Sequence, residues 1–361
     1  MKVINKELDM EMLRRLSDAK GASGFEDEVV DMLRRYAEEL GEIKEDTLRN
    51  LFIHRNGNTG NRPTVLLDAH SDEVGFMVHS IRPNGTLSIV PLGSWVTYNI
   101  PAHKVMVRNA EHEYIPGVIT SKPPHYMSEK DKLAVPDIKQ LSIDIGASSR
   151  EEANKEYKVR IGEPVVPCVT FEYDERHDVM IGKALDNRLG CAGVISALRA
   201  LEGEKLEVDV VAGIASQEEV GARGSVVTSR VTHPDLAIVF EGCPADDTVA
   251  EGYEIQTALK KGPMLRHIDG KMIANPRFQR FALDTAETCH LPVQEAVRSG
   301  GTTNGSVIHL ANEGVPTIVV GVPVRYAHTH YGMASFYDFE NSVRLVCELL
   351  KVLNEKIIAS F

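Results

Sequence analysis

The sequence is poor in cysteine, and its few cysteines are not arranged for a disulfide framework or a metal site. The 361 residues include five cysteines, which is an odd number, and no two of them form a C-x-x-C pair. Paired cysteines are the usual signature of disulfide-stapled folds and of cysteine-bound zinc. The pattern therefore argues against both classes, and we expect most of these cysteines to be small buried apolar residues.

Long apolar runs and an excess of basic residues are also missing. No stretch reaches the roughly 18 consecutive apolar residues that suit a membrane-spanning helix. The first residues, MKVINKELDMEML, contain no apolar core of a secretory signal. The formal net charge is -12, whereas proteins that bind nucleic acid normally present a basic face. We therefore expect a cytoplasmic protein that binds neither a membrane nor a nucleic acid.

The composition is that of an ordinary folded protein, with 43% hydrophobic and 25% charged residues. Because 361 residues exceed what a single core usually takes, we expect two domains. Amphipathic helices are predicted at 7–20 and 29–40, and Ser23–Glu26 resembles a capping box for the second helix. The apolar run at 64–69 predicts a buried strand.

The pattern changes to short β-like runs separated by turns from about residue 73 to residue 165. Runs at 75–78 and 87–90 flank Asn84-Gly85, which is a hairpin signal. This sequence pattern predicts a mostly β domain that is inserted into another domain. The expected bounds are 73–165 for the inserted domain, and 1–72 plus 166–361 for the domain that it interrupts.

Helix and strand patterns alternate after residue 180. We predict helices at 187–201, 221–230, 303–312 and 337–356, and apolar strands at 208–215, 236–240 and 317–322. Such alternation indicates parallel strands joined by helices. The predicted fold is therefore an α/β protein in which helices sandwich a mainly parallel sheet.

Histidines and carboxylates follow four of the predicted strands. His70-Ser71-Asp72 follows 64–69, Glu218-Glu219 follows 208–215, Glu241 follows 236–240, and His328 comes after 317–322; Asp186 precedes the helix at 187–201. Ligands of open α/β sheets bind at the carboxyl ends of the strands, so we expect these side chains to lie together. Histidines with carboxylates suit zinc, cobalt or manganese. So many carboxylates favour two ions over one.

Most of these blocks have a plainer interpretation when taken alone. His70-Ser71-Asp72 could be a surface pair, and Asp186 could be a helix N-cap. His330 competes with His328 as the histidine of the last block. Glu241 is more informative, because a carboxylate directly after five apolar residues is costly if it is buried without a partner. The combination at one sheet edge therefore supports the metal hypothesis better than any single block.

Six ordered blocks resemble those of the tetrahedral aminopeptidases, the family that includes the glutamyl aminopeptidases. They are Asp68–Gly75, Gly117–Ile119 with Lys122–His125, Asp144–Ser149, Ala184–Arg188, Gln217–Gly221 and Pro323–Thr329. The resemblance implies a metallopeptidase that removes N-terminal residues from peptides with free amino ends. It also implies that the inserted domain joins dimers, which assemble into a tetrahedral homododecamer.

The resemblance gives five residues a role at two metal ions in each subunit, which would be zinc or cobalt. Asp186 would bridge both ions. His70 and Glu241 would complete the coordination of one ion. Glu219 and His328 would complete the coordination of the other.

Two further residues would act beside the ions. Glu218 would be the general base that takes a proton from the attacking water and returns it to the leaving amine. Asp72 would orient the first metal-binding histidine. The bond between Asp186 and Asn187 would be a cis peptide bond.

Two alternatives share the metal ligands. One is a carboxypeptidase or N-deacylase of the related dinuclear superfamily, which can carry glutamate at the position of Glu241, where many tetrahedral aminopeptidases carry aspartate. The other is a metal-storing or scaffold protein, against which Glu218 beside Glu219 argues. The expected substrate pocket involves 242–247, 262–268 and 299–305. Arg266 and His267 would favour acidic substrates there, unless they are surface or interface residues.

Overall fold

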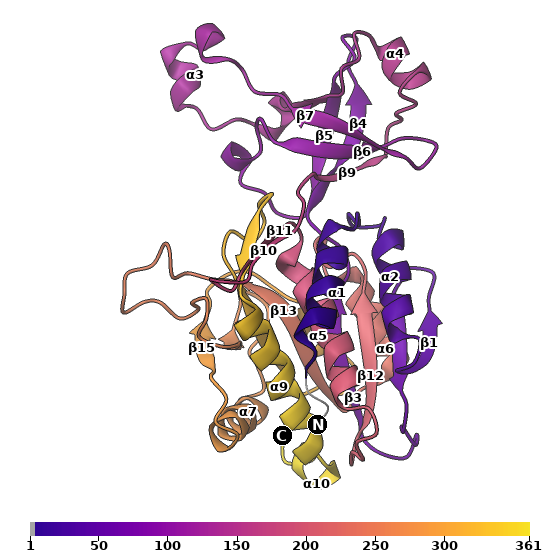
Figure 1. The fold of residues 1–361 in the computed structure, drawn as a ribbon, viewed down its shortest axis with the longest axis vertical. Helices are drawn as coiled ribbons and strands as arrows, with labels where there is room; N and C mark the ends of the chain where they lie inside the picture. The colour runs from indigo at the N-terminus through magenta and orange to yellow at the C-terminus, as the bar shows by residue number, and fades with distance from the viewer. Residues whose placement is uncertain (1–3) are drawn as a thin grey trace.

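The chain forms a helix-covered sheet with a β-barrel standing on one end of it (Figure 1). The computed structural model describes residues 4–361, the side chain of Asp131 excepted. The barrel strands lie between Gly75 and Pro167, and the chain before and after them builds the sheet and its helices. Among the described residues, no helix is long and apolar enough to cross a membrane.

Eight strands form the main sheet, in the order β1-β2-β12-β3-β13-β16-β14-β15. They are β1 (Gly41–Glu45), β2 (Leu51–Arg55), β3 (Thr64–His70), β12 (Asp209–Ala215), β13 (Leu236–Pro244), β14 (Met264–Ile268), β15 (Gln294–Val297) and β16 (Thr317–Val324). The four central strands β12, β3, β13 and β16 are parallel, as are β14 and β15, whereas the pairs β1–β2, β2–β12 and β14–β16 are antiparallel. The predicted mainly parallel sheet is confirmed.

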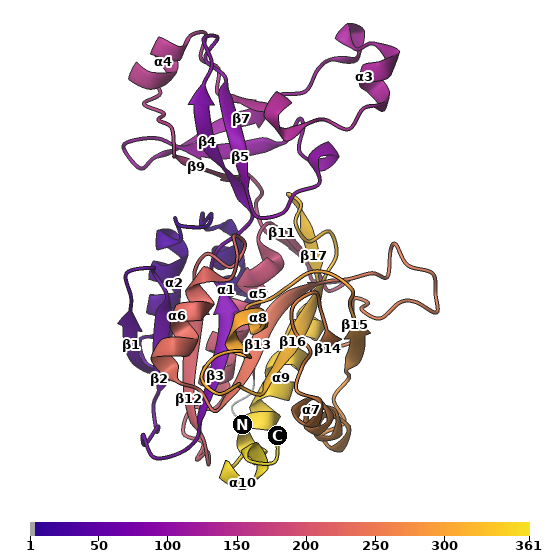
Figure 2. The ribbon, with the colours of Figure 1, turned by 180° about the vertical axis from the view of Figure 1, so that it is seen from behind.

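Helices cover both faces of this sheet, and this explains why most residues of the central strands are apolar. One face carries α1 (Lys6–Asp18), α2 (Asp27–Ala37), α5 (Leu185–Ala200), α7 (Pro276–Thr288) and α9 (Phe336–Val352), with α10 (Glu355–Ile358) at the end of the chain. The other face carries α6 (Arg223–Thr232) and α8 (Gly305–Ile308) (Figure 2). Every residue of β12 is buried between these layers.

The barrel closes in the order β4-β5-β8-β7-β6-β9 and has its own apolar core, which includes Phe76, Val107 and Ile143. Its strands are β4 (Gly75–Ile81), β5 (Leu87–Leu92), β6 (Lys104–Arg108), β7 (Tyr114–Ile119), β8 (Ser142–Asp144) and β9 (Pro164–Pro167), with the short helices α3 (Glu129–Leu133) and α4 (Arg150–Lys155) between them. The hairpin predicted around Asn84-Gly85 joins β4 to β5. A small sheet of β10 (Glu172–Asp174), β11 (Val179–Gly182) and β17 (Gly332–Ala334) lies beside the junction.

Three local predictions were wrong. Ser23 does not cap α2, because its hydroxyl donates to Asp72, and the Glu26 carboxylate accepts from Gly24 and Gln217 instead. The helix expected at 303–312 is only the single turn α8, and the helix expected at 337–356 is broken at Leu353, whose backbone is extended.

Candidate metal centre

The predicted site residues gather at the end of the main sheet that faces the barrel. His70 ends β3, Asp72 follows it, Asp186 is the second residue of α5, Glu218 and Glu219 lie between β12 and α6, and His328 lies between β16 and β17. Glu241 lies inside β13, because this strand continues three residues beyond it to Pro244. The parallel strands therefore deliver ligand-type side chains to one edge, as the sequence pattern predicted.

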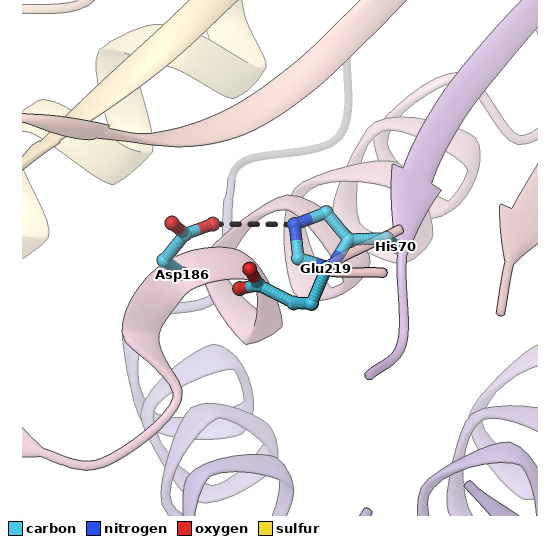
Figure 3. A group of neighbouring side chains, drawn as sticks. All are labelled: His70, Asp186 and Glu219. Atoms are coloured by element: carbon cyan, nitrogen blue, oxygen red, sulfur yellow. Dashed lines mark hydrogen bonds and ion pairs between the residues drawn. The ribbon is translucent and has the colours of Figure 1, made fainter. Parts of the chain in front are cut away.

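Asp186 lies between the two histidines and offers one carboxylate oxygen to each. His70 Nε2 is 3.2 Å from Asp186 Oδ1, and His328 Nε2 is 3.4 Å from Asp186 Oδ2. The peptide bond from Asp186 to Asn187 is cis, as the family resemblance implied. Figure 3 shows the carboxylate of Asp186 pointing at the ring of His70, with Glu219 beside them.

Each histidine has a second carboxylate partner. His70 Nε2 is 3.3 Å from Glu241 Oε1, and His328 Nε2 is 3.5 Å from Glu219 Oε2. Two atoms that bind one zinc ion at tetrahedral angles, each about 2.1 Å from it, lie about 3.4 Å apart. Ligand atoms of His70, Asp186 and Glu219 also lie within 4.8 Å of one another, so these three residues form a group that could hold a metal ion.

Asp72 connects the first histidine with the loop that carries the two glutamates. Its Oδ1 is 3.3 Å from His70 Nδ1. The amide of Glu218 donates to Asp72 Oδ1 at 2.9 Å, and the amide of Glu219 donates to Asp72 Oδ2 at 3.1 Å. The hydroxyl of Ser23 donates to Oδ2 at 2.6 Å. One buried carboxylate therefore orients a histidine and fixes the backbone of both glutamates.

The two histidines lower the pKa of Asp186, but the three glutamates of the site are buried close to other carboxylates. Burial raises the pKa of Glu219 to about 8, and it raises the pKa of Glu241. Burial, with the nearby charges of Glu241 and Glu219, also holds the pKa of Glu218 well above its usual range. Burial acts against the charge of His328, but Glu219 and Asp186 outweigh it and raise the histidine pKa to about 10. These shifts all show a site that attracts cations.

Divalent cations fit this set of donors. Within residues 4–361, Glu218 Oε1 and Glu219 Oε1 are buried and have no hydrogen-bond partner. Buried carboxylate oxygens of this kind are costly unless a cation or a donor meets them. The donors are two imidazole nitrogens and the oxygens of several carboxylates, which is a set suited to zinc or cobalt.

Several residues that shape the site were not found from the sequence. Asn187 Nδ2 donates to Glu241 Oε2 at 3.3 Å and to the carbonyl of Phe240 at 2.8 Å. The carbonyl of Ser94, in the barrel, accepts from His328 Nδ1 at 3.0 Å. No motif marks Ser94, because its contribution is a backbone carbonyl. The sequence pattern around Ser23 predicts a helix cap, whereas its hydroxyl donates to Asp72 in the structure.

A cavity of about 670 Å³ opens beside the carboxylates, and two arginines line it. Arg266 is only 4% exposed, and its Nη1 lies 3.3 Å from Asp269 Oδ2. Its Nε has no hydrogen-bond partner in the described chain. Arg298 is half-buried and donates to Asp246 at 2.8 Å. His267 instead forms a partly exposed ion pair outside the cavity lining.

Known proteins resemble the chain over nearly its whole length. A model of the M42 glutamyl aminopeptidase family matches residues 49–345. A glutamyl aminopeptidase of Lactococcus lactis is 32% identical over 96% of this chain and 97% of its own length. A lysyl aminopeptidase of Pyrococcus furiosus is 32% identical over 96% of this chain and 98% of its own.

A solved structure confirms the relationship at the level of the fold. A TET aminopeptidase from a marine sediment archaeon of the Thaumarchaeota superposes with a TM-score of 0.94 at 35% identity, covering 98% of this chain and 99% of its own. The matched length includes both the barrel and the sheet edge on which the histidines and carboxylates gather. The chain therefore belongs to the M42 glutamyl aminopeptidase family, whose members are peptide hydrolases.

Proposed function

We propose that this chain removes N-terminal residues from peptides at a centre of two divalent metal ions, zinc or cobalt. The position of Asp186, with one oxygen toward each histidine, is the observation that supports this most strongly. Asp186 would bridge the ions. His70 and Glu241 would complete one ion, and Glu219 and His328 would complete the other.

Two cations bound here would lower the pKa of a water held between them and polarise the peptide carbonyl. Glu218 would take the proton of this water and return it to the leaving amine. Its Oε2 lies 4.0 Å from His70 Nε2, and its side chain is not a close partner of either histidine, which leaves it free for proton transfer. Asp72 would keep Glu218 in place, because its carboxylate accepts a hydrogen bond from the backbone amide of Glu218.

The cavity next to the metal centre would receive the first side chain of the peptide. The relatives differ in this respect, since one is a glutamyl and another a lysyl aminopeptidase. Arg266 and Arg298 line the cavity of this chain. These two guanidinium groups bring positive charge to the cavity lining, so we propose a preference for acidic N-terminal residues.

Chromogenic glutamyl, aspartyl, leucyl and lysyl substrates test this proposal, together with an N-acetylated glutamyl peptide. We expect hydrolysis of the acidic substrates, no hydrolysis of the acetylated peptide, and loss of activity after chelation. Arg266→Met should lower kcat/KM for the glutamyl substrate relative to the leucyl one by roughly 10- to 100-fold, the value of a charge-assisted hydrogen bond. Cleavage of the acetylated peptide would favour the N-deacylase or carboxypeptidase alternative, and lysyl preference would refute the acidic pocket.

We also propose that dimers joined through the barrel domain, 73–165, assemble into a dodecamer. The TET1 peptidase of Pyrococcus horikoshii, which is 27% identical with a TM-score of 0.86 over 96% of this chain and 100% of its own, can form a tetrahedron or a large octahedral shell. The barrel side of this chain exposes large apolar side chains, among them Tyr98, Tyr126 and Leu133. Light scattering after size exclusion tests the assembly, and a stable monomer would contradict it. The cytoplasmic location stays a prediction.

A further inference from the structure

We propose that the barrel segment Gly93–Trp95 is a positioning element for one half of the metal centre, the half formed by Glu219 and His328. This inference rests on the two-ion function proposed above. The segment follows β5, touches that half of the centre in two places, and contacts the loop that carries His328 in a third. Each contact comes from a different residue of the segment.

The first contact fixes the ring of His328. The carbonyl of Ser94 accepts a hydrogen bond from His328 Nδ1 at 3.0 Å, so the proton lies on Nδ1 and Nε2 is free to bind a cation. The side chain of His328 is 35% exposed and lies on a loop. Without Ser94, its ring would be held only through Nε2.

The second contact limits the space around Glu219. Gly93 has a left-handed backbone with a φ of +81°, and a Cβ placed on it would lie 3.1 Å from Glu219 Oε2 and 2.6 Å from Val74 Cγ1. The backbone of the barrel therefore packs directly against the Glu219 carboxylate. A side chain at this position would displace Val74 or Glu219, and would also strain the turn.

The third contact holds the loop that carries His328. Trp95 stacks on Phe76 at 4.8 Å between ring centroids and donates through Nε1 to the carbonyl of Gly75 at 3.1 Å. The ring of His330 lies 5.2 Å from Trp95 and stacks on His103 of the barrel at 3.9 Å. His330 is buried, and neither of its nitrogens has a hydrogen-bond partner among the residues described. Its ring therefore holds the loop through its contacts with the rings of Trp95 and His103.

The other half of the centre is held by residues that lie outside the barrel strands. His70 is 1% exposed, and its Nδ1 faces Asp72. Glu241 lies within the central strand β13 and is held by Asn187 of α5. Weakening the barrel contacts should therefore affect one metal position and spare the other.

Calorimetric titration of the metal-stripped full-length chain with Zn²⁺ tests the inference, and Gly93→Ala is the central variant. We expect the wild type to bind two ions per chain. The variant should bind one of them at least tenfold more weakly and the other within twofold of the wild type. Circular dichroism of the stripped proteins should show the same fold.

Gly85→Ala is the matched control in the same barrel. Gly85 also has a left-handed backbone, with a φ of +87°, and the nearest atoms that a Cβ on it would meet all belong to Ala147, with the carbonyl oxygen at 2.5 Å, rather than to a proposed metal ligand. Because its Cβ meets backbone atoms, this variant strains the barrel at least as much as Gly93→Ala, and it should keep both affinities. His330→Phe, which preserves the ring stack, should bind the ion of Glu219 and His328 more tightly than His330→Ala, and the two variants should bind the other ion equally.

Two results would overturn the inference while leaving the proposed function intact. One is a Gly93→Ala chain that binds both ions as the wild type does. The other is an equal loss at both ions, or the same loss in Gly85→Ala, which would show a general effect of barrel strain. A wild-type chain that binds fewer than two ions would instead contradict the proposed function, and the inference would fail with it.

Discussion

Glu218 is the residue whose proposed role separates catalysis from metal binding. Glu218→Gln keeps the shape of the side chain but removes its capacity to accept a proton. We expect kcat to fall by about 10²- to 10⁴-fold, which is the usual contribution of a general base. Zn²⁺ binding should stay within a few-fold of the wild type, because Glu218 is not among the proposed ligands. A variant with wild-type turnover would refute the assignment, as would one that fails to bind metal.

Glu26 gives a prediction for the pH dependence of stability. It is fully buried, and its Oε1 accepts from the amides of Gly24 at 2.8 Å and Gln217 at 3.1 Å, while its Oε2 has no partner in the described structure. Burial, with the charge of Asp72, raises its pKa from 4.5 to about 7. A carboxyl with a raised pKa stabilises the fold at low pH, and this contribution is lost as pH rises through about 7.

Glu26→Gln keeps an oxygen for both amides and removes the charge. The wild type should therefore lose on the order of 3 kcal/mol between pH 4 and pH 8.5 that the variant does not lose. Thermal unfolding of the stripped proteins at several pH values measures this difference. The advantage of the variant should widen as pH rises, and an advantage that does not change with pH would contradict the raised pKa.

The residues of the proposed centre were grouped from the sequence and lie together in the structure, whereas several residues that support them were missed. His70, Asp186 and His328 belong to contiguous blocks that end strands or begin a helix, so a pattern could identify them. Glu26 and Ser94 act on the site from remote segments, because the Glu26 carboxylate accepts from the amide of Gln217 and the Ser94 carbonyl accepts from His328 Nδ1. A backbone carbonyl requires no particular residue type, and sequence spacing reveals neither contact.

At the scale of elements, a buried ion cluster ties the start of the barrel to α5, which carries Asp186. Lys183 Nζ is 2.6 Å from Glu73 Oε1, and Arg188 Nη2 is 3.3 Å from the same oxygen. Lys183 and Arg188 also donate to the carbonyl of Ala19 in the turn between α1 and α2. The cluster therefore fixes three elements around one carboxylate.

Glu73→Gln should destabilise the chain more than Lys183→Met. The first variant leaves two buried cations without a counter-charge, and breaking a buried pair in this way costs about 3–5 kcal/mol. The second variant leaves the pair of Glu73 with Arg188, and burial already lowers the pKa of Lys183 to about 8. Chemical denaturation followed by circular dichroism ranks the two, and the opposite order would refute this account of the cluster.

The elements that were predicted correctly are those in which burial alone determines the hydrophobic pattern of the sequence. The central strands β3, β12 and β16 consist mostly of buried apolar residues, because helices cover both of their faces. The strands β14 and β15 were not predicted. They are short and lie at the edge of the sheet, where mixed polar and apolar residues give no clear period.

At the scale of the whole molecule, the barrel domain contacts the loop that carries His328. The sequence indicated a mostly β domain here through its short β-like runs. Its closure, and its contact with the loop of His328, depend on strand pairings between distant residues, such as Phe76 with Val165. Such pairings follow from the three-dimensional arrangement and leave no local signal. The proposed active site therefore spans two parts of the chain that the sequence suggested were separate.

Titration of the metal-stripped full-length chain with Zn²⁺, followed by the rate of hydrolysis of a glutamyl chromogenic substrate, tests the two-ion centre most directly. We predict that the rate saturates at two equivalents per chain, and that Asp186→Asn, which weakens the proposed bridge between the ions, greatly reduces both binding and rate. A rate that saturates at one equivalent, or that persists in the presence of chelator, would contradict the two-ion centre.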